Sequence, residues 1–475
     1  MRARLQQLSQ RKFVRDTAIL QSAKFVVLGF SILSSLVVWR LLGPDLYGIW
    51  GLGQSLFIVL SLVNLSGVAM STTTRLPIAV GANDQPEITR LMGLHLQFTL
   101  LANGLIILFL LFLGTWITTQ LYPDASVADR VSGIAVGVAV ASIADGFYNL
   151  LLLTFASRRL MGWYAVMQMV NQVVLTSLNI IFVGLLRQPE GLLLARICYS
   201  YITFFIALWA YQHLKHRDDV TFPAISNVVR MMFKVSPIPY LGFGVTNAMD
   251  KNASSLFQHL PLQLVGIWGG TTAVGYLNLA LNGLAQLSVF TAAIFENMQA
   301  IIPRAVGRKD YVSLQRNFTR VLMLLTLGSA VFYSVFALLA PLVLPIVLGD
   351  HWRPAIPTLS VLAIFGAFTT VGGLFGLLYR ALDLLRPALI VKVVTWVIVF
   401  IPFWLVVQPE APVYWGENFI EPQVIANAMN LHAQSVSVAG AWLINLLYMV
   451  SIVLTACITL PVLKRRAREH QQQEL

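Results

Sequence analysis

Long apolar runs fill most of this sequence and restrict the fold more than any other feature. Each of twelve runs is long enough to cross a bilayer as a helix, which takes about 20 residues. Uninterrupted segments such as "LIILFLLFLGTWI" lack the alternating pattern of a barrel strand. The sequence therefore predicts an all-α polytopic membrane protein with 12 transmembrane helices. The predicted spans are residues 17–42, 46–70, 92–121, 127–156, 161–186, 189–213, 238–266, 270–300, 317–348, 354–379, 387–407 and 436–463.

Composition supports a chain that faces lipid. Charged residues make up only 11% of it, against about 25% in soluble domains. The net charge of +12 would suggest a nucleic-acid partner in a soluble protein. Here the basic residues lie in short gaps between apolar runs, so we expect no nucleic-acid partner. The two cysteines, Cys198 and Cys457, lie inside apolar runs and form no disulfide or zinc pattern.

The distribution of Lys and Arg predicts the topology. The N-terminal tail, the gaps after even-numbered spans with their adjoining helix ends, and the C-terminal tail carry 25 of the 32 basic residues. The odd-numbered gaps and their helix ends carry 5, and 2 lie within spans. Because positive charge is retained in the cytoplasm, both termini are expected there, with an even number of spans between them.

A polar passage occurs twice. "PIAVGANDQPEITR" (77–90) and "PRAVGRKDYVSLQR" (303–316) agree at six of fourteen positions with an offset of 226. Upstream, "LLGPDLYGIW" (41–50) resembles "WGGTTAVGYL" (268–277) once a one-residue gap places Gly48 over Gly275. Two matches in the same order indicate an internal duplication.

Each copy of the passage follows the second span of a six-span set. Six spans restore the original orientation, so the duplication predicts two parallel six-helix lobes around a central cavity. We expect an N-terminal lobe at 1–213, a cytoplasmic linker at 214–237 and a C-terminal lobe at 238–475. The external loop 408–434 is expected to be a partly ordered cap; a short interfacial helix near "EPQVIANAMNLH" or a disordered insertion are the alternatives.

Charged residues inside the spans are the first candidates for function. They are Lys24, Asp145, the Asp250–Lys251 pair and Glu296. A charge at the bilayer centre costs about 2.5–3.5 kcal/mol on insertion scales, so such residues usually face a bundle interior or a wet cavity. The one-residue gap also superposes Lys24 on Lys251. Two related cations suit an anionic ligand held between the lobes.

Each of these charges also has a structural interpretation. Lys24 could snorkel to the cytoplasmic interface, and Asp250 could neutralise Lys251. Asp145 could be a polar contact between helices, and Glu296 could lie at the interface. Asp145, Asp250 and Glu296 are also candidates for binding a coupling ion.

Polar amides recur at about helical spacing in two spans. Asn278 and Asn282 lie in the eighth span with Gln286, and the fifth span carries Asn171, Gln172 and Asn179. Such stripes more often join helices than bind sugars, but together they suggest a hydrophilic interior.

No enzyme signature is present in the sequence. It lacks a phosphate loop, HExxH, GxSxG and a dinucleotide glycine pattern. We therefore expect a protein that is not an enzyme and needs no cofactor or metal. A membrane glycosyltransferase or ligase remains an alternative, and "GDHWRPA" (349–355) is the nearest candidate for a catalytic loop.

The opening "RDTAILQSAKFVVLGFSILSSLVVWRLLGPDLYGIWGLGQSL", the passage 77–90 and the "GDHWRPA" junction carry a family resemblance. The sequence resembles the polysaccharide-biosynthesis transporters of the multidrug/oligosaccharidyl-lipid/polysaccharide (MOP) exporter superfamily, over nearly the whole chain apart from 408–434. The resemblance is diffuse, and it depends on the order and spacing of the segments.

This resemblance implies an O-antigen-type flippase of the bacterial inner membrane. Its cargo would be an oligosaccharide repeat unit on undecaprenyl pyrophosphate, and its partners would include a polysaccharide polymerase and glycosyltransferases. Lys24 and Lys251 would then lie on cavity-lining helices and meet the pyrophosphate. The alternatives are a cation-coupled drug exporter of the same superfamily and a scaffold for polysaccharide assembly that does not transport.

Overall fold

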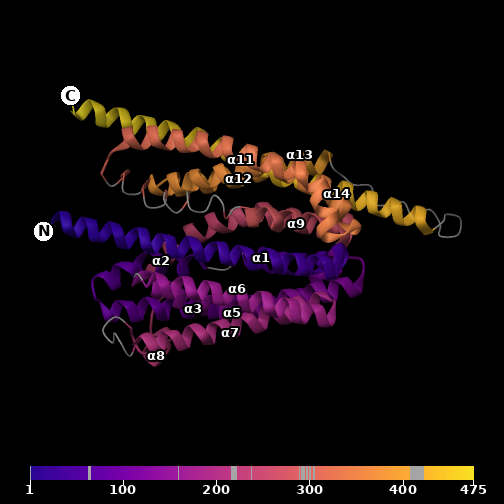
Figure 1. Ribbon diagram of the computed structural model, residues 1–475, viewed down its shortest axis with the longest axis horizontal. Helices are drawn as coiled ribbons and strands as arrows, with labels where there is room; N and C mark the ends of the chain where they lie inside the picture. Colours follow the sequence, from indigo (N-terminus) through magenta and orange to yellow (C-terminus); the bar gives the residue numbers. More distant parts are fainter. Residues whose placement is uncertain are drawn as a thin grey trace. The chain divides into compact units, whose positions relative to one another are not determined.

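The computed structural model describes residues 2–61, 66–158, 160–215, 222–236, 238–287, 308–406 and 422–474, with 289, 295, 298, 301–302 and 305–306. Over these residues the chain forms helices joined by short turns, without a β-strand (Figure 1). Its elements are α1 (Arg2–Leu60), α2 (Ser66–Gly81), α3 (Gln85–Phe109), the π-helical η2 (Leu110–Gly114), α4 (Thr115–Leu121), α5 (Ala125–Ser157), α6 (Met161–Leu186), α7 (Pro189–Lys215), α8 (Ile225–Met232), α9 (Ile238–Leu287), α11 (Tyr311–Leu348), the 3-10 helix η3 (Asp350–Ala355), α12 (Ile356–Ala381), α13 (Leu385–Val406) and α14 (Pro422–Glu474).

The helices account for the predicted spans and confirm the all-α polytopic fold. In the described part of the chain, nine helices are long and apolar enough to cross a membrane. The helix α1 contains the predicted span 17–42 and begins the span 46–70, which α2 completes. The helix α9 contains 238–266 and residues 270–287 of the span 270–300, and α12 occupies the predicted span 354–379. Described helices therefore lie at all twelve predicted spans, and most of residues 288–300 of the eighth span lies outside the described residues. Hydropathy predicts well that a membrane-spanning helix is present, because the signal is summed over all the residues of the span.

The two long helices break at equivalent glycines. Gly43 in α1 has φ 67° and ψ 178°, and Gly270 in α9 has φ 72° and ψ −173°. Only glycine adopts this region readily, because it has no Cβ. The two positions are 227 apart, the offset that the one-residue gap predicts. The same backbone break in both halves supports the duplication.

The repeated passage forms the same tight turn in both copies. Asn83 and Lys309 have positive φ values of 53° and 59°. In each copy the following aspartate caps the next helix: the Asp84 carboxylate accepts from the amide of Glu87 at 3.1 Å, and that of Asp310 from the amide of Ser313 at 3.1 Å. The polar passage 77–90 is thus mostly helix, since α2 ends at Gly81 and α3 begins at Gln85.

The chain divides into two compact units. The first comprises Met1–Leu42 and Leu56–Met249, and the second comprises Gly43–Ser55 and Asp250–Leu475. This division follows packing, whereas the predicted lobes 1–213 and 238–475, with the linker 214–237, are repeat units. The lobes therefore stay a prediction. Of the loop 408–434, residues 408–421 lie outside the described residues, and the rest opens α14.

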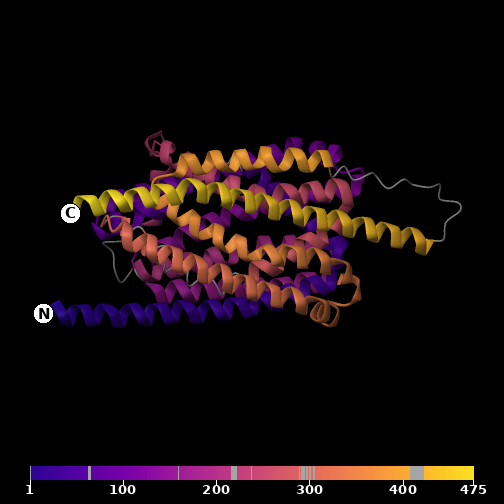
Figure 2. The ribbon, with the colours of Figure 1, turned by 90° about the horizontal axis from the view of Figure 1, so that it is seen from above.

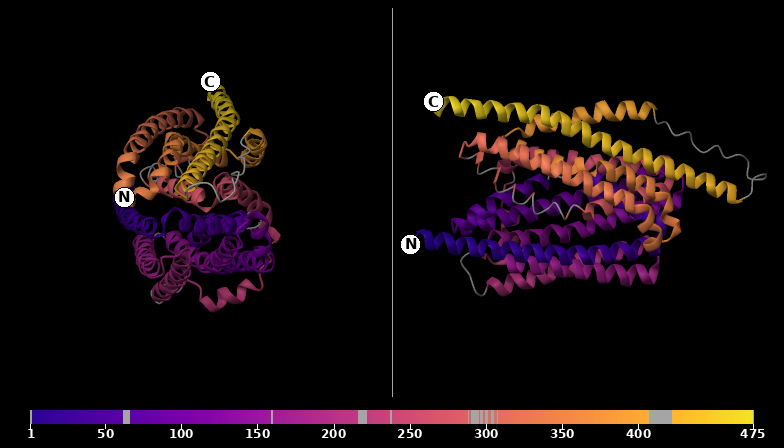
Figure 3. Two further views of the ribbon diagram at one scale, coloured as in Figure 1. Left: turned by 90° about the vertical axis from the view of Figure 1, so that its right-hand side faces the viewer. Right: turned by 45° about the horizontal axis from the view of Figure 1, so that its top comes forward.

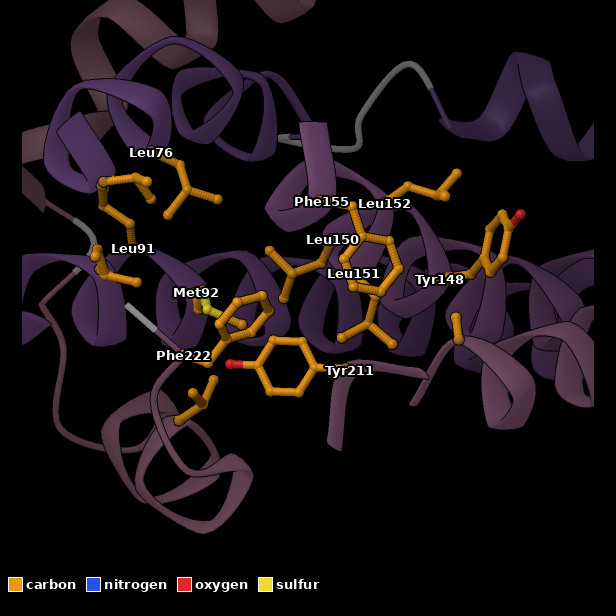
Figure 4. Close-up of a cluster of buried hydrophobic side chains, with 14 of the residues drawn as sticks. Leu76, Leu91, Met92, Tyr148, Leu150, Leu151, Leu152, Phe155, Tyr211 and Phe222 are labelled. Atoms are coloured by element: carbon orange, nitrogen blue, oxygen red, sulfur yellow. The ribbon is translucent and has the colours of Figure 1, made fainter. Parts of the chain in front are cut away.

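Each unit has its own apolar core. In the first, α2, α3, α5 and α7 enclose Leu91, Met92 and Phe155, and Tyr211 packs edge-on against Phe222 at 5.2 Å between ring centroids (Figure 4). In the second, α14 runs along α12 and α13 (Figures 2 and 3). The core there gathers Phe318, Leu374 and neighbouring residues of α11, α12 and α14. These packed helices hold the polar groups described next.

Candidate functional site

A fully buried carboxylate gathers three partners inside the second unit. The side chain of Asp250, on α9, has 0% of its surface exposed. The Tyr379 hydroxyl donates to its two oxygens at 2.9 and 3.1 Å, and Arg380 Nη2 donates to Oδ2 at 3.0 Å. Lys392 Nζ forms an ion pair with Oδ1 and donates to the backbone carbonyl of Asp250 at 2.8 Å. Several charge-assisted hydrogen bonds therefore offset the cost of burying this charge.

A short turn brings the partners together. Tyr379 and Arg380 lie in the last turn of α12, and Lys392 lies two turns into α13. Between them Asp383 takes a positive φ of 60°, and the amide of Leu384 donates to the carbonyl of Tyr379 at 2.7 Å. The helices α12 and α13 thus leave the turn as neighbours. Both present their polar side chains to α9.

The cluster forms one wall of a cavity of about 420 Å³. Tyr379, Arg380 and Lys392 line it, and no acidic side chain occurs among the described lining residues. The lining also contains hydroxyl and aromatic side chains, namely Ser254, Thr369, Ser451, Thr455, Phe257, Phe295 and Tyr448. Lys392 is nearly buried at 8% exposed, whereas 44% of the Arg380 side chain is exposed. Arg380 is therefore the cation that a bound molecule can reach.

The charge balance of the cluster favours an anion. Two cations face one carboxylate, which leaves a formal charge of +1 beside the cavity. In a space of low polarity this excess acts more strongly than it would in water. Arginine also presents several donors in a plane that matches phosphate oxygens. The arrangement can hold a phosphate-like or carboxylate-like group, with hydroxyl groups nearby as further partners.

The predicted lysines are only partly described. Lys24 is half-buried in α1, within the first unit. Lys251 is helical, but its side chain lies outside the described residues, as does Glu296. The predicted anion site between Lys24 and Lys251 therefore stays a prediction. The described partners of Asp250 come from α12 and α13.

Asp145 joins two helices of the first unit. It pairs with Arg196 of α7, whose guanidinium also contacts the Tyr199 hydroxyl. The two charged side chains are about three-quarters buried. This geometry matches the interpretation of Asp145 as a polar contact between helices.

Asn278 and Asn282 lie in the second unit, on the part of α9 that follows the Gly270 kink. Asn282 Nδ2 donates to the Tyr47 hydroxyl at 2.9 Å and to Asn278 Oδ1 at 2.8 Å. Asn278 is buried. The Asn282 amide thus joins α9 to the segment 43–55, and neither asparagine lines the 420 Å³ cavity.

Sequence reasoning missed Tyr379, Arg380 and Lys392. Lys392 gave a usable signal, because it lies five residues inside the predicted span 387–407, where a cation is costly. The topology count instead assigns it to the neighbouring gap. Tyr379 and Arg380 gave no comparable signal, since they stand at a helix end that looks interfacial.

Comparison with solved structures identifies the fold. A eukaryotic MATE transporter, AtDTX14, is 14% identical, with 98% of this chain and 99% of that chain covered and a TM-score of 0.63. A MOP superfamily transporter from Pyrococcus furiosus is 14% identical, with 94% and 96% covered and a TM-score of 0.64. An inward-facing multidrug resistance MATE family transporter of the MOP superfamily is 14% identical, with 94% and 99% covered and a TM-score of 0.69. At this identity the likeness establishes the fold that these structures share and no more.

The sequence itself decides the family. No curated protein matches the chain. The family model described as "Polysaccharide biosynthesis protein" matches residues 37–357, which is more than half of the chain. This chain therefore belongs to the polysaccharide biosynthesis protein family.

Proposed function

We propose that the protein is a flippase and not an enzyme. It translocates an oligosaccharide repeat unit on undecaprenyl pyrophosphate across the bacterial inner membrane by alternating access, for O-antigen or exopolysaccharide synthesis. The observation that carries the proposal is the 420 Å³ cavity with Arg380 and Lys392 in its wall and no described acidic lining residue. Membership of a polysaccharide biosynthesis family and a fold shared with transporters support it.

The physical task explains why such a site is useful. A sugar headgroup with its pyrophosphate must pass through hydrocarbon while its lipid tail stays in the membrane. A polar, net-positive cavity replaces water around the anion. Outward movement is favoured as well, since each negative charge leaving a negative interior gains about 2.3 kcal/mol per 100 mV. Lys24 and Lys251 are proposed as further pyrophosphate contacts, and Asp145, Asp250 and Glu296 as candidates for coupling.

A cation-coupled drug exporter is the second candidate, because several structures with this fold are described as multidrug transporters. The charge of the described cavity weighs against it. A lipophilic cation would meet Arg380 and Lys392, and the Asp250 carboxylate is already bound to both. Like charges at close range oppose binding. The drug exporter predicts that lipophilic cations compete with the cargo.

The proposal predicts that Arg380→Gln loses transport. A strain deleted for the gene should accumulate the lipid-linked oligosaccharide on the cytoplasmic leaflet, and the intact gene should restore surface polysaccharide. We expect Arg380→Gln to restore about tenfold less at equal protein level, because a charge-assisted hydrogen bond contributes about 1.5–3 kcal/mol. Arg386→Gln, six residues along and exposed, is the matched control and should restore fully.

The predicted lysines are tested in the same strain. At least one of Lys24→Ala and Lys251→Ala should abolish restoration, and full restoration by both would remove their role at the pyrophosphate. If Arg380→Gln also restored fully, the cavity would not be the path of the anion. A scaffold that does not transport would then be the better explanation.

A further inference from the structure

The short helix α8 (Ile225–Met232) is fixed to the first unit by one side. Val228 and Met232 are buried, and α8 packs so closely on α3 that a Cβ on Gly93 would lie 3.0 Å from the backbone nitrogen of Met232. Just before the helix, the Tyr211 hydroxyl donates to the carbonyl of Pro223 at 2.8 Å. The position of α8 at the end of α3 and α7 is thus well defined (Figure 1).

The exposed part of this segment includes large apolar side chains. Phe233 has 79% of its surface exposed, and Val229 and Ile238 are also exposed. These side chains flank the end of membrane-spanning helices. Amphipathic helices beside a membrane lie in the interface, with their apolar side chains among the acyl chains near the headgroups.

Between α8 and the start of α3 lies a pocket of about 280 Å³. Arg230 and Lys234 line it together with Thr89 and Asn227. Neither Arg230 nor Lys234 makes an ion pair or a side-chain hydrogen bond with another residue that the structure describes. The pocket is thus bounded by two cations whose donors are available to a ligand.

The acidic groups nearby on α3 are already engaged. The Asp84 carboxylate caps the helix through the amide of Glu87, and Glu87 lies 3.8 Å from Arg90. Together with Arg230 and Lys234 these groups leave a formal excess of one positive charge. An anion is therefore the ligand that this pocket favours.

We infer that this pocket binds the headgroup of an anionic phospholipid. The phosphate diester would receive donors from Arg230 and Lys234, and the acyl chains would lie beside Phe233. A free phosphate would use the cations but not the exposed apolar surface, so the lipid accounts for both features. The segment falls in the linker 214–237, which topology predicts on the cytoplasmic side, where anionic lipid attracts basic segments. The inference does not depend on the proposed cargo.

The test uses purified full-length protein stripped of lipid. Native mass spectrometry would follow the binding of phosphatidylglycerol and of phosphatidylcholine. A basic side chain near an anionic surface contributes about fivefold in affinity, so we expect Arg230→Gln/Lys234→Gln to bind phosphatidylglycerol roughly thirtyfold more weakly. Binding of phosphatidylcholine should not change.

The control removes the same charge from exposed sites on the same predicted side of the membrane. Arg386→Gln/Arg468→Gln should bind phosphatidylglycerol like the parent. Equal affinity of the Arg230/Lys234 variant and the parent would overturn the inference, as would a parent without preference between the two lipids. Glycerol 3-phosphate serves as a competitor: if it displaced the lipid at similar concentration, the site would take free phosphate instead. Both variants change exposed side chains, so an unchanged melting temperature should show that they remain folded.

Discussion

Asp250→Asn is expected to destabilise the protein by about 3–5 kcal/mol, the cost of removing one partner from a buried ion pair. The destabilisation arises because the variant leaves two cations without their carboxylate partner. Lys392 is only 8% exposed and would keep its charge beside Arg380 with no carboxylate to balance them. An asparagine side chain offers one acceptor oxygen, whereas the carboxylate accepts from three side chains, those of Tyr379, Arg380 and Lys392. The measurement is thermal unfolding of the purified protein in detergent.

A second substitution, at Lys392, should compensate for the loss of the Asp250 charge. Lys392→Met alone should cost less, because Arg380 and Tyr379 still bind Asp250. The double variant Asp250→Asn/Lys392→Met removes one charge of each sign and should recover much of the loss, which a double-mutant cycle would show as coupling. The exposed pair Asp350–Arg353 is the matched control, and Asp350→Asn should cost about 0.5 kcal/mol or less. If the Asp250→Asn variant had the same melting temperature as the parent, the cluster would not stabilise the fold.

The same variants separate structure from transport. The double variant keeps the net charge of the cluster and is expected to be stable. If it also restores surface polysaccharide, Asp250 and Lys392 have a structural role, and Arg380 is the member of the cluster that serves the cargo. If it is stable but inactive, Asp250 and Lys392 take part in binding or coupling.

Local sequence patterns predicted the elements that local physics determines. The spans follow from hydropathy. The breaks at Gly43 and Gly270 were not predicted, although the one-residue gap aligns the two glycines. The caps at Asp84 and Asp310 explain why an aspartate recurs in the repeated passage. Each of these features is set within a few residues of chain.

The cluster could not be predicted in the same way. Asp250 lies 129 residues from Tyr379 and 142 from Lys392, so no spacing rule links them. Lys251 follows Asp250 directly in the sequence and was the simpler candidate for its partner. Lys392 was counted with the gap before the predicted span 387–407, because it lies close to the start of that span. Only packing of α9 against α12 and α13 decides which charge meets which.

Gly48→Ala and Gly275→Ala are expected to be among the most damaging small substitutions in the chain. A Cβ on Gly48 would overlap the carbonyl oxygen of Thr271, and a Cβ on Gly275 would overlap that of Pro44. The two clashes are reciprocal. They show that the segment 43–55 and α9 cross with their backbones in contact inside the second unit. In lipid, where apolar burial does not drive helix association, close backbone packing through small residues does.

Each alanine must push two backbones apart, because a carbonyl oxygen cannot rotate away as a flexible side chain can. Overpacking of this kind costs about 1–3 kcal/mol or more, and here it would also strain the Asn282–Tyr47 hydrogen bond across the same crossing. We therefore expect both variants to melt several degrees below the parent and to reach lower levels in the membrane. Gly283→Ala is the control: it lies on the same helix with open space around it, and alanine should be neutral or mildly stabilising there. Should Gly48→Ala and Gly275→Ala prove as stable as Gly283→Ala, the crossing is not held by backbone contact, and the two glycines would mark common ancestry of the halves without a present structural role.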